Sequence, residues 1–458
     1  MNINPLRKSN LSGQHFFEQP AAFSNGVKFR SSILMKIALI LLLPAPAFLC
    51  AETPLLLDHC FRAAMKRSET LAGQQELVVQ AEEHYRQAWG SIMPSVNGSY
   101  TYFRQDSSGG NGTGGTSSSS TEQTLKITAD QPLFRGFRDF GAIAADRSFI
   151  TAQEQARDWA GMQLYMDVAQ GFYTLLAVQK DAQLLDNEIG IYQKRINELQ
   201  ERIAIGRSRV TEVLAVKSAQ AILKAQREQV YGQLDAAKEV LAFLTGLDQN
   251  TPLDDTDAVP AKLEPLDSYQ SMLDARPDII AAKKNVEYFK SNVSVAGGER
   301  LPSADLTGDY YLQGKNLQQN GIWDAQIAVT LPVFAGGIIS SDIKIAESQE
   351  RQSEQQLSRV ERLAVEDIRT FHHNLQADLA QLTALQDAFN IAEENYKANV
   401  KDYELGLVTN LDVLQALTSY QDTARSLEKI RYQSKIDYNK LEAAAAKRLN
   451  LMKRSKQQ

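Results

Sequence analysis

An internal duplication governs how this chain of 458 residues can fold. Three short segments occur twice, in the same order along the chain. The copies are centred on Pro94 and Pro302, on Phe134 and Phe334, and on Gly206 and Gly406. The spacing is 208 residues for the first pair and 200 residues for the other two. Repeats in one order with compatible spacing indicate two copies of one structural unit, so we predict a duplicated architecture instead of unrelated domains.

Each copy is predicted to contain a helix, two strands, a very long helix and a further helix. Apolar and polar residues alternate in 124–131 and 322–332, which is the period of a strand with one apolar face. The preceding segments 95–104 and 303–312 are rich in tyrosine and alternate less regularly. The sequence therefore predicts a mostly helical fold with four strands, arranged as two hairpins.

The longest predicted helix lies between Asp342 and Leu405, where 64 residues contain no glycine or proline. Such a helix would measure ~96 Å. Apolar or small residues recur in it about every 3.5 residues, as in a coiled coil; these positions are 357, 360, 364, 368, 371, 375, 379, 382, 385, 389, 392, 396, 400 and 403. Its counterpart is expected at 139–205. Gly206 and Gly406 follow the two helices as C-terminal caps, so each long helix should turn back as a helical hairpin.

Residues 1–51 have the pattern of a leader with an export signal. Met35 and Lys36 precede an apolar run at 37–43, which is followed by proline and small residues. We expect Met35 to be the true start and cleavage to follow Ala47 or Ala51. The remaining chain is then divided into a first repeat at 52–248, a linker at 249–266 and a second repeat at 267–458.

Cys50 could carry a lipid after processing, but Leu49 precedes it where lipoprotein signals need a small residue. With Cys60 as the other cysteine, the chain has no disulfide framework. No run of 18 apolar residues occurs, so no transmembrane helix is expected.

Composition and motifs exclude several classes of function. A net charge of −6 argues against a nucleic-acid partner. The run Gly110–Gly115 matches GxGxxG but lies within a Ser/Gly-rich segment at 107–121, where we expect a hairpin loop. His372 and His373 should point to different sides of one helix, so we expect no metal site there. With no catalytic set, we expect no enzyme and no cofactor.

Four strands are too few to close a barrel, which needs about eight. Several copies that each contribute four strands would close one in a membrane. The alternative is a pair of soluble hairpins packed on the helices. The charged long helices must stand in water, so together with a barrel they would form a tunnel.

The order of these motifs resembles the TolC-like outer-membrane efflux protein family. The resemblance spans about residues 56–451 and rests on four segments: Pro132-Leu133-Phe134-Arg135-Gly136, Leu331-Pro332-Val333-Phe334-Ala335-Gly336-Gly337, Arg276-Pro277-Asp278-Ile279, and Tyr403-Glu404-Leu405-Gly406 followed by Leu411-Asp412-Val413-Leu414. It implies a homotrimer with a trimeric α-barrel crossing the periplasm and a 12-stranded transmembrane β-barrel in outer-membrane lipid.

The same resemblance implies a function in efflux or type I secretion. The chain would be the passive exit duct of a periplasmic adaptor and an inner-membrane pump of the RND or ABC type. The alternative from another class is a periplasmic adaptor or structural coiled-coil protein without a pore. An adaptor would show one helical hairpin and flanking lipoyl-like segments, whereas this chain shows a duplicated hairpin and amphipathic strand pairs.

The resemblance also implies a gate at the two hairpin turns, next to Gly206 and Gly406. Tyr403 matches the family's gate tyrosine, and Glu212 matches its acidic partner. Asp412 matches the first ring of acidic residues that selects cations. The second ring position holds Gln415, and Val408 replaces the family's basic residue at the turn. Each residue also has a plainer interpretation, because Asp412 and Glu212 could cap helices and Tyr403 could pack between them.

Overall fold

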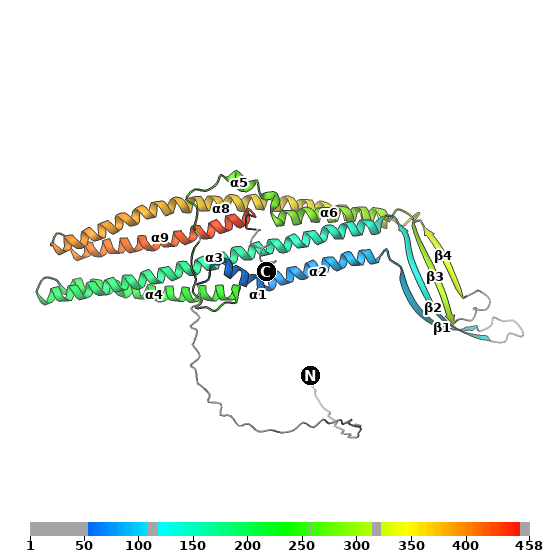
Figure 1. Cartoon of the computed structure of the whole chain (residues 1–458), viewed down its shortest axis with the longest axis horizontal. Helices are drawn as coiled ribbons and strands as arrows, with labels where there is room; N and C mark the ends of the chain where they lie inside the picture. The colour runs from blue at the N-terminus through cyan, green and yellow to red at the C-terminus, as the bar shows by residue number, and fades with distance from the viewer. Residues whose placement is uncertain (1–53, 108–117, 257, 314–321, 449–458) are drawn as a thin grey trace, which may run out of the picture. The chain divides into compact units, whose positions relative to one another are not determined.

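The structure is a computed structural model that describes residues 54–107, 118–256, 258–313 and 322–448 (Figure 1). The expected leader, Cys50 and the Gly110–Gly115 run lie outside these residues. The described residues belong to one compact unit that begins at Glu52. None of its described helices is both long enough and apolar enough to cross a membrane.

The described elements repeat in the two halves of the chain. The first half contains α1 (Leu57–Arg67), α2 (Glu69–Gly90), β1 (Ser95–Ser107), β2 (Ser118–Arg135), α3 (Arg138–Ala204) and α4 (Val210–Thr245). The second contains α5 (Leu266–Gln270), a 3-10 turn (Leu273–Ala275), α6 (Pro277–Gly298), β3 (Ser303–Gln313), β4 (Trp323–Thr330), α8 (Ile338–Glu404) and α9 (Asn410–Ala444). The predicted order of helix, two strands, long helix and helix is confirmed.

The first hairpin is longer than expected. The loop expected at 107–121 is partly strand, because Ser118 pairs with Ser107 and Thr121 pairs with Arg104. Serine and threonine give no periodic apolar signal, yet their backbone groups continue the ladder as well as any others. The prediction of a loop from composition was therefore wrong over these residues.

The four strands form one antiparallel sheet in the order β1-β2-β3-β4. The register places Ile127 beside Tyr310, and Leu306 beside Ile327. Paired residues share a face, so the alternating apolar residues of all four strands line one side. The other side is polar: Lys126 and Thr128 both donate hydrogen bonds to Asp309. The sheet therefore has one apolar and one polar face, as the alternation predicted.

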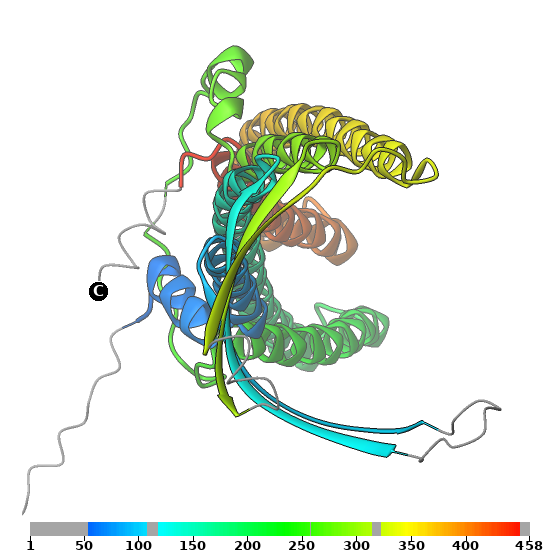
Figure 2. The same cartoon turned by 90° about the vertical axis from the view of Figure 1, so that its right-hand side faces the viewer.

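The helices pack side by side as a curved layer (Figure 2), and this layer extends away from one end of the sheet (Figure 1). Near the strands α2 packs on α3, α3 on α6 and α6 on α8. Farther away α4 packs on α3, α3 on α9 and α9 on α8. Within the described chain, α2 and α8 thus form the edges near the strands, and α4 and α8 form the edges near the turns.

The core lies between these helices. All the α8 positions with the predicted coiled-coil spacing are buried or half-buried. Both helical turns use a glycine with left-handed backbone, φ 72° at Gly206 and 74° at Gly406, a conformation that costs other residues energy. Residues 249–256 lie beside the start of the described chain, where Asp254 N donates to Leu55 O at 3.1 Å.

Candidate functional site

The ends of the two helical hairpins meet in one apolar cluster. Leu199 and Val213 of the first hairpin pack there with Tyr403 and Leu414 of the second. The turns at Gly206 and Gly406 lie at this end of the helical layer (Figure 1). The structure therefore brings together the ends of the two hairpins, where the resemblance implies a gate.

Tyr403 is buried at the end of α8 between two arginines of α3. The guanidinium carbon of Arg195 lies 4.0 Å from the centre of the Tyr403 ring, and that of Arg202 lies 4.6 Å from it. Cations attract the face of an aromatic ring, more strongly when water is excluded. We call these three residues the arginine clamp; it joins the inner end of the second hairpin to the first.

Arg195 has a second contact with the second hairpin. Its Nε donates to Asn410 Oδ1 at 2.9 Å, and Asn410 is the buried first residue of α9. Its Nη1 donates to Glu198 Oε2 at 3.1 Å, on the same helix. Only 8% of Arg195 is exposed. A buried guanidinium that binds both helices of the other hairpin fixes how the two hairpins meet.

Sequence reasoning missed Arg195, although the duplication holds a signal of it. At a spacing of 200 residues the second copy has Asn395, so the arginine departs from the repeat. It also falls at a position that packs inward, where an unpaired charge would be costly.

Glu212 lies in the first turn of α4 and is half-buried. Its Oε2 accepts a hydrogen bond from Ser208 Oγ at 2.7 Å. In the described part of the chain no hydrogen bond joins Glu212 to Tyr403, so the gate contact inferred from the resemblance stays a prediction.

Asp412 caps the start of α9. Its Oδ2 accepts hydrogen bonds from Thr409 N at 2.8 Å and Thr409 Oγ1 at 2.6 Å, and its own amide donates back to Thr409. This is a reciprocal capping box. The hydrogen bonds from Thr409 hold the pKa of the Asp412 carboxyl below its usual value. Asp412 and Gln415 are both exposed, so the carboxylate caps the helix and stays charged in water.

A second group of charged side chains lies between α3 and α9, farther from the hairpin turns than the arginine clamp. Arg425 of α9 makes a bidentate contact with Asp181 of α3, at 2.6 and 3.1 Å. Burial raises the pKa of nearby Glu188 to about 7, although Arg425 opposes the shift. The contact between Arg425 and Asp181 ties α3 to α9. The described residues contain no group of three or more potential metal ligands.

The Arg-Pro-Asp-Ile segment begins with Arg276, a buried residue that joins several helices. Only 1% of this residue is exposed. Its guanidinium binds Asp278 at 2.8 and 3.0 Å and Asp367 at 3.2 Å, and lies 4.5 Å from the ring centre of Trp159. It also donates to the backbone oxygens of Ala364 and Ala444. One side chain therefore connects α3, α6, α8 and the end of α9.

The two histidines of α8 lie as predicted. His372 is buried beside Tyr269, and His373 is exposed. His372 Nε2 lies 3.2 Å from the backbone oxygen of Glu264. His372 therefore holds the segment before α5, and His373 faces solvent.

A comparison with protein-family models decides the family. The model described as "Outer membrane efflux protein" matches residues 61–247 and 268–447, which is most of the chain. The chain belongs to the outer membrane efflux protein family. The two matched segments correspond to the two halves of the fold, each with its sheet hairpin and helical hairpin.

Curated relatives of this efflux protein include an outer membrane protein and a cation efflux system protein. The outer membrane protein TolC of Vibrio cholerae is 25% identical over 304 residues, covering 62% of this chain and 69% of that protein. The cation efflux system protein CusC of Escherichia coli K12 is 23% identical over 399 residues, covering 81% and 83%.

Solved structures share the fold. A membrane protein from Pseudomonas aeruginosa matches with a TM-score of 0.77 and 19% identity, over 85% of this chain and 92% of that one. The outer membrane protein VceC of Vibrio cholerae matches with a TM-score of 0.74 and 20% identity, over 85% and 95%.

The efflux protein is thus an outer-membrane channel of the kind used in tripartite efflux or type I secretion systems. Family members are channels and not enzymes. The alternative of a pore-less adaptor or structural coiled-coil protein does not agree with this family match.

Proposed function

We propose that three copies of this chain close head to tail into one passive exit duct. The observation that carries this proposal is the pattern of free edges. The sheet ends in β1 on one side and β4 on the other, and the helical layer likewise ends in different helices. Unlike edges pair as a heterologous interface, and such interfaces close into a ring when the rotation fits. Three copies give twelve strands, enough for a membrane barrel.

The apolar face of the sheet is the surface for outer-membrane lipid. Trp323, Ile327 and Val329 on β4 are all strongly exposed in the single chain. Where the strands join the long helices, Phe334 is 90% exposed, and Phe137 packs edge to face against Phe134. Apolar faces bounded by aromatic residues are typical of barrels at a membrane boundary. The polar face of the sheet would line the water-filled interior.

Replacing Ile327 by lysine should hinder assembly in the outer membrane. A lysine at the middle of a lipid-facing strand costs about 2–4 kcal/mol. The measurement is the yield of trimer in isolated outer membranes, from unheated gels. The neighbouring change Gln326→Lys is the matched control, because Gln326 lies on the polar face. Equal, normal trimer yields for both variants would show that this face does not meet lipid.

The hairpin turns are proposed as the periplasmic gate and cation filter. Three exposed Asp412 carboxylates around one axis would attract cations, as acidic rings do in cation-selective pores. Aspartates are ionised in the neutral range, and the hydrogen bonds from Thr409 hold the pKa of Asp412 below even its usual value. Gln415 adds no charge one turn farther along, so the ring has one layer of acids.

Replacing Asp412 by asparagine should weaken block of the channel by divalent cations added on the periplasmic side. The measurement is single-channel current in planar bilayers as the cation concentration rises. Glu404→Gln is the control, since Glu404 is also exposed near this turn. Unchanged block in Asp412→Asn would remove Asp412 from the channel mouth.

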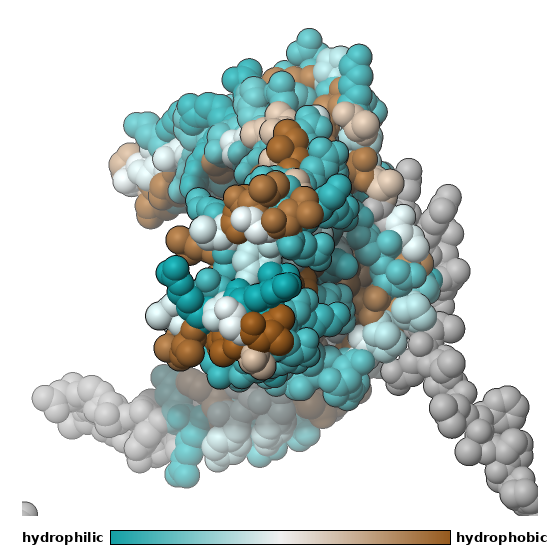
Figure 3. Space-filling model, turned by 90° about the vertical axis from the view of Figure 1, so that its left-hand side faces the viewer, coloured by the Kyte–Doolittle hydropathy of each residue, from teal (hydrophilic) through white to brown (hydrophobic). Residues whose placement is uncertain are grey.

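The hairpin turns also offer a docking surface to a periplasmic adaptor. Ile205 of the first hairpin and Leu407 and Leu411 of the second are each about two-thirds exposed or more. Figure 3 looks at this end of the molecule and shows apolar residues gathered on both hairpins. Exposed apolar clusters mark protein contacts. Through the adaptor the duct would receive cargo from an inner-membrane pump of the RND or ABC type, and the pump would determine what is exported.

A further inference from the structure

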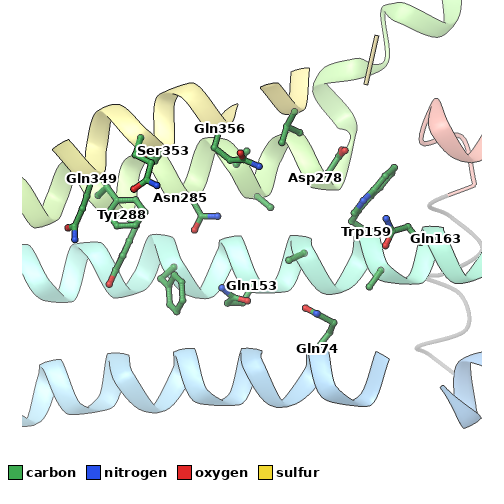
Figure 4. A pocket seen from close by; sticks show the side chains of 18 residues that line it. Gln74, Gln153, Trp159, Gln163, Asp278, Asn285, Tyr288, Gln349, Ser353 and Gln356 are labelled. Atoms are coloured by element: carbon green, nitrogen blue, oxygen red, sulfur yellow. The ribbon is translucent and has the colours of Figure 1, made fainter. Parts of the chain in front are cut away.

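A cavity of about 810 Å³ opens between α2, α3, α6 and α8, in the half of the helical layer near the strands (Figure 4). Both copies of the repeat contribute to its lining. Small side chains on facing helices leave the space, and these are Ala156, Ala160, Ala281 and Ala282. The cavity lies apart from the hairpin turns and plays no part in the proposed gate.

Primary amides dominate the polar lining. Seven of the lining residues carry one: Gln74, Gln153, Gln163, Asn285, Gln349, Gln352 and Gln356. Figure 4 shows labelled amides from all four helices, spread along the length of the cavity from Gln349 to Gln163. No hydrogen bond joins any of these seven side chains to another described residue; Gln74, Gln153 and Asn285 are half-buried and the other four are exposed at the open side of the cavity. Each therefore has a donor and an acceptor to offer.

The cavity is also nearly free of charge, although 23% of the chain is charged. Among the described residues that line it there is no lysine, arginine, histidine or glutamate. The one acid is Asp278, whose two oxygens are already bound by Arg276. A charged ligand would find no unpaired counter-charge in this lining.

Aromatic rings form the apolar part of the lining. Phe149 of α3 and Tyr288 of α6 lie 5.0 Å apart between ring centres, at an interplanar angle of 34°. Phe289 and Trp159 line the cavity as well. Apolar rings with a few convergent hydrogen-bonding groups are the usual lining of a small-molecule site.

We propose that this cavity binds an uncharged molecule that combines a ring with several hydroxyl or amide groups. The rings pack against its apolar face, and the free amides exchange hydrogen bonds with its polar groups. A passive duct needs no such site, so this inference goes beyond the proposed function. The proposal predicts that the wall of the duct binds uncharged ring compounds with hydroxyl or amide groups more tightly than charged compounds.

Equilibrium dialysis of the full-length protein in detergent tests the proposal with two matched probes. 4-Nitrophenyl β-glucoside is uncharged, and 4-nitrophenyl β-glucuronide differs from it by a carboxylate. We expect saturable binding of the glucoside at one site per chain, and binding of the glucuronide at least about tenfold weaker. The double variant Gln153→Leu, Gln352→Leu should lose glucoside binding. The control Gln381→Leu, an exposed amide elsewhere on α8, should keep it.

Absent saturable binding, equal binding of the two probes, or unchanged binding by the double variant would each overturn the proposal. Single-channel conductance of the same preparations is recorded alongside. A protein that conducts normally but fails these binding tests contradicts the site alone, whereas absent conductance would count against the duct.

Discussion

Replacing Arg276 by alanine will remove most of the folded protein from the outer membrane. The change leaves two carboxylates without their partner and two backbone oxygens without a donor. Breaking a fully buried charge pair by removing one side costs about 3–5 kcal/mol. Water screens part of this cost because the side chains of Asp278 and Asp367 are 16% and 36% exposed, but the remainder and the two lost backbone hydrogen bonds are still a large share of a typical folding free energy. The loss should be severe because the guanidinium joins four helices. Trimer yield and the midpoint of thermal unfolding measure it.

Arg276→Lys and Arg300→Ala complete this experiment. Lysine keeps the charge but cannot bind several acceptors in one plane as arginine does, so its unfolding midpoint should lie between those of the wild type and the alanine variant. Arg300 is exposed after α6, and its replacement should have little effect. Wild-type stability in Arg276→Ala would contradict the role given to this residue.

Replacing Arg195 by glutamine will loosen the packing between the two helical hairpins and so open the proposed gate. Tyr403 then loses one of its two cations and Asn410 loses its hydrogen-bond donor. A desolvated cation–π contact contributes about 2 kcal/mol, and a hydrogen bond from a charged group about 1.5–3 kcal/mol. The predicted result is a severalfold larger single-channel conductance in planar bilayers, with trimer yield retained.

Arg209→Gln is the matched control for this variant. Arg209 precedes α4 at the same turn and is exposed, so its loss changes the charge near the mouth equally without touching the arginine clamp. Arg195→Lys keeps a cation near Tyr403 and should give an intermediate conductance. If Arg195→Gln and Arg209→Gln conduct alike, the clamp does not hold the hairpins together.

Periodicity and repetition made much of the fold predictable. The long helices begin and end within a few residues of the predicted bounds, because glycine-free runs and the glycines that follow them are local signals. The four strands were found from alternation or from their place in the repeat. The ends of β1 and β2 were missed, because strand pairing there uses backbone groups of serine and threonine that carry no pattern.

The contacts at the hairpin turns could not be read from sequence in the same way. Asp412 was recognised as a candidate for both capping and gating, and its capping box is present. The partners of Tyr403 were not foreseen, since Arg195 and Arg202 lie about two hundred residues away and meet it only when the hairpins pack. Arg276 was noticed as part of a motif, but its contacts on four helices depend on packing. The amide-lined cavity likewise joins residues from both repeats.

Reconstitution of the purified full-length protein into planar lipid bilayers tests the central claim most directly. A closed trimeric duct with an acidic mouth predicts discrete current steps of low conductance that select cations over anions. The same steps should grow in Arg195→Gln and become less sensitive to divalent cations in Asp412→Asn. A trimeric, folded protein that produces no current steps, or steps selective for anions, would contradict the account.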